Sequence, residues 1–346
     1  MALSNDSKMH LGKIVVDPDF LLFRPRSHYR TSASVIILRT EEPIILDTGM
    51  RLKPSVSLIQ RTITKFGMKP DAFKYLILTH DHQDHTQNLR NFQRHFPLIK
   101  TICHEKDAPT IRFPFKLSQA WGEGFRYYGM HGPSLFFYKC IYGIFGNVYY
   151  RTLLLPNHID YVINHSTRLH LNHDWVDLLP VPGHSNGQLM VRDCRKNLFV
   201  SDFVPFTPWI EPTRDSIDEI LESCRYILKF NSDEIKRTIR AHGDMRISNP
   251  DHWEVNPWSV EKPKYQFFLD TLLDTLERIP LFLKHNPMDV EQLTSRIIPH
   301  YKNYSKLMAR LFMPPAISWG IAYGLYLEKH GKIQRCINHG KICWTS

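Results

Sequence analysis

Short apolar runs alternate with amphipathic stretches along the first 110 residues. The runs at 34–38, 43–46, 75–78 and 98–103 are too short for buried helices and predict strands that are covered on both faces. Between the second and third runs, residues 54–66 repeat apolar side chains at helical spacing. This part of the chain is therefore typical of a mixed α/β fold.

A second group of strand-like runs follows at 175–181, 189–191 and 197–200. Residues 215–230 then carry apolar side chains on one helical face, and a short run at 236–239 follows them. We therefore expect a second set of strands that is covered by a helix.

From about residue 262 the pattern becomes helical. Residues 266–283 predict an amphipathic helix that is interrupted at Pro280. Asp289 is expected to be the N-cap of a helix over 290–298, with Gln292 at the capping-box position.

The end of the chain predicts a helix over 316–330 and a hairpin formed by 332–337 and 341–344. The order helix, helix, two-stranded wing is typical of a winged-helix module. We therefore expect a catalytic domain over residues 1–261 and a helical, winged-helix-like domain over residues 262–346.

The segment from about 110 to 170 is dense in phenylalanine, tyrosine and tryptophan. One interpretation is a helical insert that forms a lid or wall over a site and accepts an apolar group. The other is an insert that packs on its own domain or forms a homodimer contact. The sequence favours neither.

Composition narrows the class of protein. The 346 residues contain no apolar run of membrane-spanning length, so we expect no membrane association. The 6 cysteines include no CxxC pair, which favours a reducing compartment such as the cytoplasm. Cys336 and Cys343 flank the predicted hairpin turn and are expected to be free thiols. The net charge of +10 permits an anionic partner such as RNA without requiring one.

The strongest chemical signal follows the run at 75–78. Four candidate metal ligands lie within six positions, namely His80, His82, Asp84 and His85. Imidazole and carboxylate are ligands that zinc, iron and manganese accept. With this spacing, the two alternate histidines can bind one metal and the last two residues another.

Four other motifs end strand-like runs with an aspartate or a histidine. They are Asp47-Thr48-Gly49, Pro182-Gly183-His184, Ser201-Asp202 and Ala241-His242-Gly243. Each is weak alone, but loops at one edge of a sheet commonly gather catalytic groups. Together with the histidine cluster they predict one shared site.

These five motifs, in this order, resemble the signature of the metallo-β-lactamase fold hydrolase superfamily. The resemblance extends from about Asp17 to His252 and implies a four-layer αββα sandwich. Ser201 and Ala241 stand where the family usually has glycine. The C-terminal helix, its following Gly331-Lys332-Ile333 and a late Trp344 resemble the winged-helix tail of the β-lactamase-like endoribonuclease branch. Members of that branch include an endoribonuclease acting on single-stranded RNA and uncharacterised acyl hydrolases.

The resemblance implies two divalent metal ions, zinc first, with iron and manganese as alternatives. The ligands that it implies are His80, His82 and His184 for the first metal and Asp84, His85 and His242 for the second, with Asp202 bridging them. Asp47 and Thr79 would lie behind these ligands and orient them. The expected catalytic carboxylates are Asp84 and Asp202.

The activity implied is hydrolysis by a hydroxide that the two metals share. The aromatic segment favours a small-molecule substrate, a partly apolar ester, thioester or lactone. The alternative is a phosphodiesterase acting on single-stranded RNA, which the positive charge and the winged-helix pattern favour. A third hypothesis is a non-catalytic metal-binding protein, against which the intact ligands argue. β-Lactamase activity is expected only as a side activity.

Overall fold

The computed structural model describes residues 14–24, 33–50, 56–113, 126–127, 132–133, 136, 157–207, 209–242, 255–284, 286–298 and 315–346. Most of the aromatic segment expected between 110 and 170 lies outside these residues, so its role as a lid, a packing element or a dimer contact stays a prediction.

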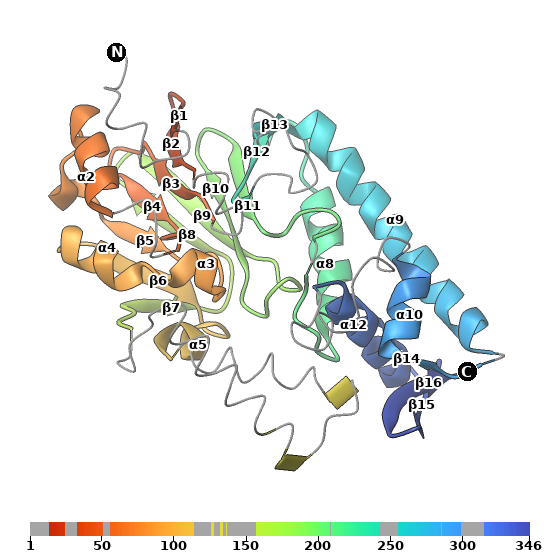
Figure 1. The fold of residues 1–346 in the computed structure, drawn as a ribbon. Helices are drawn as coiled ribbons and strands as arrows, with labels where there is room; N and C mark the ends of the chain where they lie inside the picture. Colours follow the sequence, from red (N-terminus) through yellow and green to blue (C-terminus); the bar gives the residue numbers. More distant parts are fainter. Residues whose placement is uncertain are drawn as a thin grey trace.

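Two stacked sheets form the centre of the molecule (Figure 1). The first sheet has the order β1 (Ile14–Val16), β2 (Phe20–Phe23), β3 (Val35–Leu38), β4 (Ile44–Leu46), β5 (Tyr75–Ile77), β6 (Lys100–His104) and β7 (Tyr161–Ile163). The second has the order β13 (Val255–Pro257), β12 (Arg237–Arg240), β11 (Asn197–Ser201), β10 (Leu189–Asp193), β9 (Asp174–Pro180) and β8 (Thr167–Leu171). The segment expected to be an insert therefore ends in two strands, β7 and β8, that belong to the sheets.

Helices cover the outer face of each sheet. The first sheet carries α2 (Val56–Lys65), a short 3₁₀ turn η2 (Pro70–Ala72), α3 (Gln83–Thr86), α4 (Leu89–His95) and α5 (Ala108–Arg112). The second is covered by α8 (Ser216–Leu228) and α9 (Trp258–Leu283). These layers give the expected order helix, sheet, sheet, helix.

Strand periodicity explains the layers. On β3, Val35 and Ile37 pack toward α2 and α4, whereas Ile36 and Leu38 pack against the second sheet. Successive side chains of a strand point to opposite faces, so a strand that is covered on both faces is apolar throughout. This pattern is why the continuous apolar runs of the sequence predicted these strands correctly.

A smaller unit packs at the end of the second sheet's helical layer. It contains α10 (Val290–Ile297), α12 (Pro315–Lys329) and a three-stranded sheet of β14 (Met288–Asp289), β16 (Lys341–Thr345) and β15 (Gln334–Asn338). The capping box of Asp289 and Gln292 is present, as predicted. Cys336 and Cys343 face each other across the hairpin as free thiols. The boundary predicted at residues 261 and 262 stays a prediction.

One helix differs from the expectation. We predicted a break at Pro280, but α9 runs without interruption from Trp258 to Leu283. Pro280 removes a backbone hydrogen bond within the last turn only. The side chains of Ile279 and Leu283 are fully buried beside it, and their burial offsets that cost.

Arg237 connects the two sheets through an ion pair. Its guanidinium donates to both carboxylate oxygens of Asp17 at 2.7 and 2.8 Å and to Asp19 at 2.9 Å. Burial alone would raise the pKa of Asp17, but the hydrogen bonds from Arg237 and the backbone of Asp19 outweigh it and lower that pKa below its usual 3.8. Asp17 therefore adds stability that is complete above pH 3.8 and is lost as the pH falls through the folded-state pKa.

Replacing Arg237 with alanine should lower the free energy of unfolding by about 1–3 kcal/mol at neutral pH, because a bidentate charged pair is lost. The difference from the wild-type protein should narrow below pH 3.8. Urea denaturation at several pH values measures both effects. Arg278→Ala, which removes an exposed pair with Asp274, is the matched control and should change stability little. An equal loss in both variants would contradict the prediction.

Candidate metal centre

The first half of the site is the loop that follows β5 at one edge of its sheet. The chain leaves β5 at Ile77, passes His80 and reaches His82, which is the N-cap residue of α3. His85 lies within this short helix and is fully buried. Because β4 and β5 are parallel neighbours, Asp47 ends up beside the same loop.

The second half comes from the other sheet. His184 follows β9, Asp202 follows β11 and His242 follows β12. β11 and β12 are parallel, and β9 runs in the same direction because β10 is antiparallel to both β9 and β11. The three loops therefore meet at one edge and face the loop after β5.

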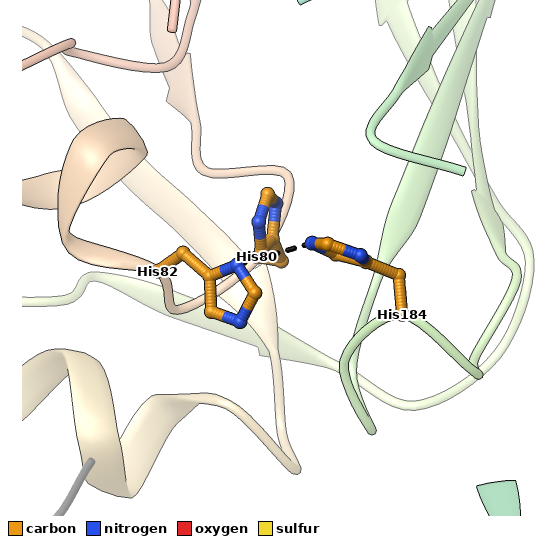
Figure 2. A group of neighbouring side chains, drawn as sticks. All are labelled: His80, His82 and His184. Atoms are coloured by element: carbon orange, nitrogen blue, oxygen red, sulfur yellow. Dashed lines mark hydrogen bonds between the residues drawn. The ribbon is translucent and has the colours of Figure 1, made fainter. Parts of the chain in front are cut away.

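Three imidazoles form the first ligand group. His80, His82 and His184 each offer a nitrogen, and these nitrogens lie within 4.8 Å of one another. Nε2 of His184 is 3.1 Å from Nδ1 of His82. Figure 2 shows the three rings converging from the two halves of the fold. All three residues are buried.

The second ligand group lies next to the first. It consists of Asp84, His85 and His242, whose ligand atoms again lie within 4.8 Å of one another. Nε2 of His242 is 3.1 Å from a carboxylate oxygen of Asp84 and 3.2 Å from Nε2 of His85.

Asp202 lies between the two groups. Its carboxylate oxygens are 3.5 Å from His184, 3.5 Å from His85 and 3.4 Å from His242. This carboxylate is therefore near ligands of both groups, which is the position that a bridging ligand needs. The structure thus brings together all seven residues expected to bind metal.

Asp47 and Thr79 fix which histidine nitrogens face the centre. Asp47 accepts from Nδ1 of His85 at 2.7 Å, and it also accepts from the backbone N–H and the hydroxyl of Thr79. The Thr79 hydroxyl, having donated to Asp47, can only accept from Nδ1 of His80 at 3.2 Å. His80 and His85 therefore both direct Nε2 toward the centre, which leaves this nitrogen available to a metal.

The residues present fit a divalent cation. Nε2 of His80 is buried and has no hydrogen-bond partner among the described residues. An unpaired polar atom is costly in a protein interior, whereas a lone pair on a neutral imidazole is a ligand for zinc, iron or manganese. This atom, together with the converging imidazoles and carboxylates, supports a metal centre here.

Burial keeps the first three imidazoles neutral. It lowers the pKa of His80 well below the usual value, and the pKa of His82 to about 3, with neighbouring histidines adding to both effects. Burial also lowers the pKa of His184. Neutral imidazoles bind a metal without first losing a proton.

The second group has the opposite electrostatics. Burial opposes protonation of His85, but Asp47 and Asp202 outweigh it and raise its pKa well above the usual value. For His242, Asp202 likewise outweighs burial and raises the pKa to about 10. Burial alone would raise the pKa of Asp202, but His242 and His85 hold it well below its usual range. This half of the site is therefore suited to hold positive charge.

Several backbone positions around the centre are strained. Asp47, Ser201 and Phe206 have φ values of 59°, 51° and 61°, a region that is unusual for residues other than glycine. Ser201, which stands where the family usually has glycine, compensates with a hydroxyl 2.7 Å from that of Thr79. Serine therefore keeps the glycine conformation and adds a contact behind the ligands.

Two residues of the site were not predicted. Asp107 accepts from the backbone N–H of Asp81 and from the hydroxyl of Ser185, so it links the loop of His80 to the loop of His184. Trp209 places its ring 4.7 Å from that of His82, and its carbonyl accepts from Nδ1 of His184 at 2.8 Å. Neither residue belongs to a motif with metal-ligand spacing, so only the folded structure identifies them.

A family model matches the part of the chain that carries six of the seven candidate ligands, all but His242. The model of the metallo-beta-lactamase superfamily matches residues 29–235, more than half of the chain. The chain belongs to the metallo-beta-lactamase superfamily. This superfamily is hydrolytic and typically binds divalent metals. No curated protein sequence matches the chain significantly.

Solved structures of the superfamily share the fold over nearly the whole chain. A metallo-beta-lactamase family protein from Thermus thermophilus has a TM-score of 0.66 at 14% identity, covering 96% of this chain and 99% of that one. A beta-lactamase domain protein from Burkholderia ambifaria has a TM-score of 0.67 at 14% identity, covering 97% and 95%. At this identity the likeness shows the fold alone, and the predicted four-layer fold is thereby confirmed.

Proposed function

We propose that the protein is a binuclear metal-dependent hydrolase of a partly apolar ester, thioester or lactone. In this proposal one cation is held by His80, His82 and His184 and the other by Asp84, His85 and His242, with Asp202 shared. Zinc is the first expectation for this donor set, with iron and manganese as alternatives.

The cations, when bound, supply a nucleophile at neutral pH and polarise the substrate oxygen. The chain's own residues set the geometry. Asp202 keeps the two ligand groups together, and the buried pair of Asp47 and Thr79 fixes the imidazoles of His80 and His85. Asp84 is a quarter exposed, so it can exchange a proton with solvent during turnover.

The observation that carries the substrate class is the position of Trp209. Its indole lies edge-on to the rings of His82 and His184, at centroid distances of 4.7 and 5.7 Å. The side chain is partly exposed, and the indole adds an apolar face to the surroundings of the ligands. Such a face favours an acyl chain or ring over a highly charged substrate.

The C-terminal elements support a winged-helix-like module of the endoribonuclease branch, because their order is β14, α10, α12 and then the β15–β16 hairpin. The surface of this C-terminal module gives less support to the RNA alternative. Arg335 pairs with Glu328, Lys341 pairs with Asp289, and Lys329 pairs with Asp215 and Asp218. Basic side chains already neutralised within the chain attract phosphate weakly.

Metal analysis and a substrate panel test the proposal. The purified protein should contain about two metals per chain. It should hydrolyse a lactone or thioester faster than bis-p-nitrophenyl phosphate or single-stranded RNA. Absence of metal, with no activity after addition of zinc or manganese, would exclude the hydrolase. Salt-sensitive cleavage of RNA, faster than that of any ester, would favour the phosphodiesterase.

Replacing Trp209 with alanine should raise KM for a long-chain thioester about tenfold and leave KM for a short acetyl ester nearly unchanged. Burial of an apolar group contributes about 1.5–3 kcal/mol, and each 1.4 kcal/mol is a factor of ten. Steady-state kinetics on the two substrates measure the difference. The matched control is Trp175→Ala, because Trp175 lies near the start of β9, where it contacts Arg168. Equal changes for both substrates would mean that Trp209 does not contact the acyl group.

A further inference from the structure

One loop follows the shared carboxylate and returns to the first ligand group. Residues 203–211 connect Asp202 to the turn before α8. Within this loop, the Trp209 carbonyl accepts from Nδ1 of His184 at 2.8 Å, and the Thr207 hydroxyl lies 3.2 Å from the same nitrogen. These contacts place the imidazole hydrogen on Nδ1 and leave Nε2 for a metal.

The loop is held by the C-terminal part of the chain. Nε1 of Trp319 donates to the Thr207 carbonyl at 3.0 Å, and the backbone N–H of Ile210 donates to the hydroxyl of Ser318 at 3.2 Å. Both side chains belong to α12, and their two partners in the loop lie on either side of Trp209 in the sequence. The hydroxyl of Tyr265, on α9, donates to the Phe203 carbonyl at 2.6 Å.

Helix α12 is otherwise an apolar, buried helix. Ser318 is fully buried and Trp319 is 6% exposed. Polar atoms in such an environment are costly unless they are hydrogen-bonded. Their partners belong to the loop that carries Trp209, which lies more than a hundred positions earlier in the sequence.

We infer that Ser318 and Trp319 are positioning residues for the metal ligand His184. They fix the backbone on both sides of Trp209, and the carbonyl of Trp209 then fixes the orientation and tautomer of the imidazole. The C-terminal elements thereby become part of the support of the metal centre. This inference rests on the proposed metal site.

The energetics favour a measurable effect. Removing either polar group leaves a buried backbone partner in the loop unpaired, so the loop must shift to reach another partner or solvent. Partners that orient a metal-binding histidine typically contribute a factor of about 10–100 to metal affinity.

The test compares Trp319→Phe and Ser318→Ala with Tyr323→Phe. Tyr323 is on the next turn of α12, and its buried hydroxyl bonds to Thr275 rather than to the loop. All three variants remove one polar group from the same helix. Competition with a chromophoric chelator measures Zn²⁺ affinity. ¹H–¹⁵N spectra of histidine-labelled, metal-free protein report the Nδ1–H of His184, which is assigned through His184→Gln.

Trp319→Phe and Ser318→Ala should each weaken Zn²⁺ binding about tenfold and shift or remove the Nδ1–H signal. Tyr323→Phe should leave both readouts as in the wild-type protein. Unchanged affinity and an unchanged signal in the first two variants would overturn the inference, as would equal losses in all three. If the wild-type protein binds no Zn²⁺, the proposed function fails, and the Nδ1–H signal alone decides whether α12 positions His184.

Discussion

Asp202→Ala should reduce kcat/KM by about a thousandfold or more and leave fewer than two metals per chain. Stabilisation of developing charge by metals amounts to several kcal/mol, and each 1.36 kcal/mol is a factor of ten in rate. Asp202 lies within 3.5 Å of His85, His184 and His242, so its removal affects both ligand groups at once.

The loss should have an electrostatic component as well. Asp202, together with Asp84, outweighs burial in raising the pKa of His242, so without Asp202 the imidazoles of the buried His85 and the partly buried His242 lose a negative partner. Steady-state kinetics and elemental analysis at fixed zinc concentration measure the effect. Asp71→Ala, in the exposed 3₁₀ turn η2 that precedes β5, should change neither quantity. Full activity of the Asp202 variant with two metals bound would refute a shared role for this residue.

Trp344→Ala should lower the free energy of unfolding by about 3–5 kcal/mol, the usual range for removing a buried tryptophan. The indole is fully buried and stacks on Tyr127 at a centroid distance of 5.8 Å. Gly324 of α12 has no side chain, and the indole ring occupies the space that a side chain there would need. Removal of the indole would therefore open a cavity between the three-stranded sheet and α12, the helix that supports the metal centre.

Chemical denaturation of the metal-free protein measures this loss without interference from metal binding. Trp344→Phe should recover part of the stability because it keeps an aromatic ring. Ile337→Ala, on the neighbouring strand with 77% of the side chain exposed, should cost less than about 0.5 kcal/mol. If Trp344→Ala were as stable as Ile337→Ala, the C-terminal unit would contribute little to the folded core.

The sequence predicted most of the strands that are covered on both faces, because a short continuous apolar run with turn residues at its ends is typical of a buried strand. The buried strand β2 was missed. The sequence also did not predict β1, β7, β8, β13 or the two-residue β14. In the edge strand β8, exposed polar residues such as Arg168 and His170 interrupt the apolar pattern. The edge strand β7 has only three residues, too few to show a pattern. For α9, propensity rules predicted an interruption at Pro280, whereas the burial of Ile279 and Leu283 keeps the helix continuous.

The seven candidate ligands could be found from the sequence because metal chemistry restricts them to histidine and aspartate at the ends of strands. The residues that orient them could be found only in part. Asp47 and Thr79 lie in or next to ligand motifs. Trp209, by contrast, acts through its backbone carbonyl, and the side chains of Ser318 and Trp319 act on the backbone of its loop. Every residue has a backbone carbonyl, so no sequence pattern identifies the one that orients a ligand.

The division of the ligands between two sheets has a consequence for how the protein unfolds. His82 and His184 are 102 positions apart, and His85 and His242 are 157 apart. A cation held by each set would act as a crosslink that closes a long chain segment and that exists only while both halves are folded. In amide hydrogen exchange, adding zinc should therefore slow the opening of both sheets together, and the two halves should behave as one cooperative unit.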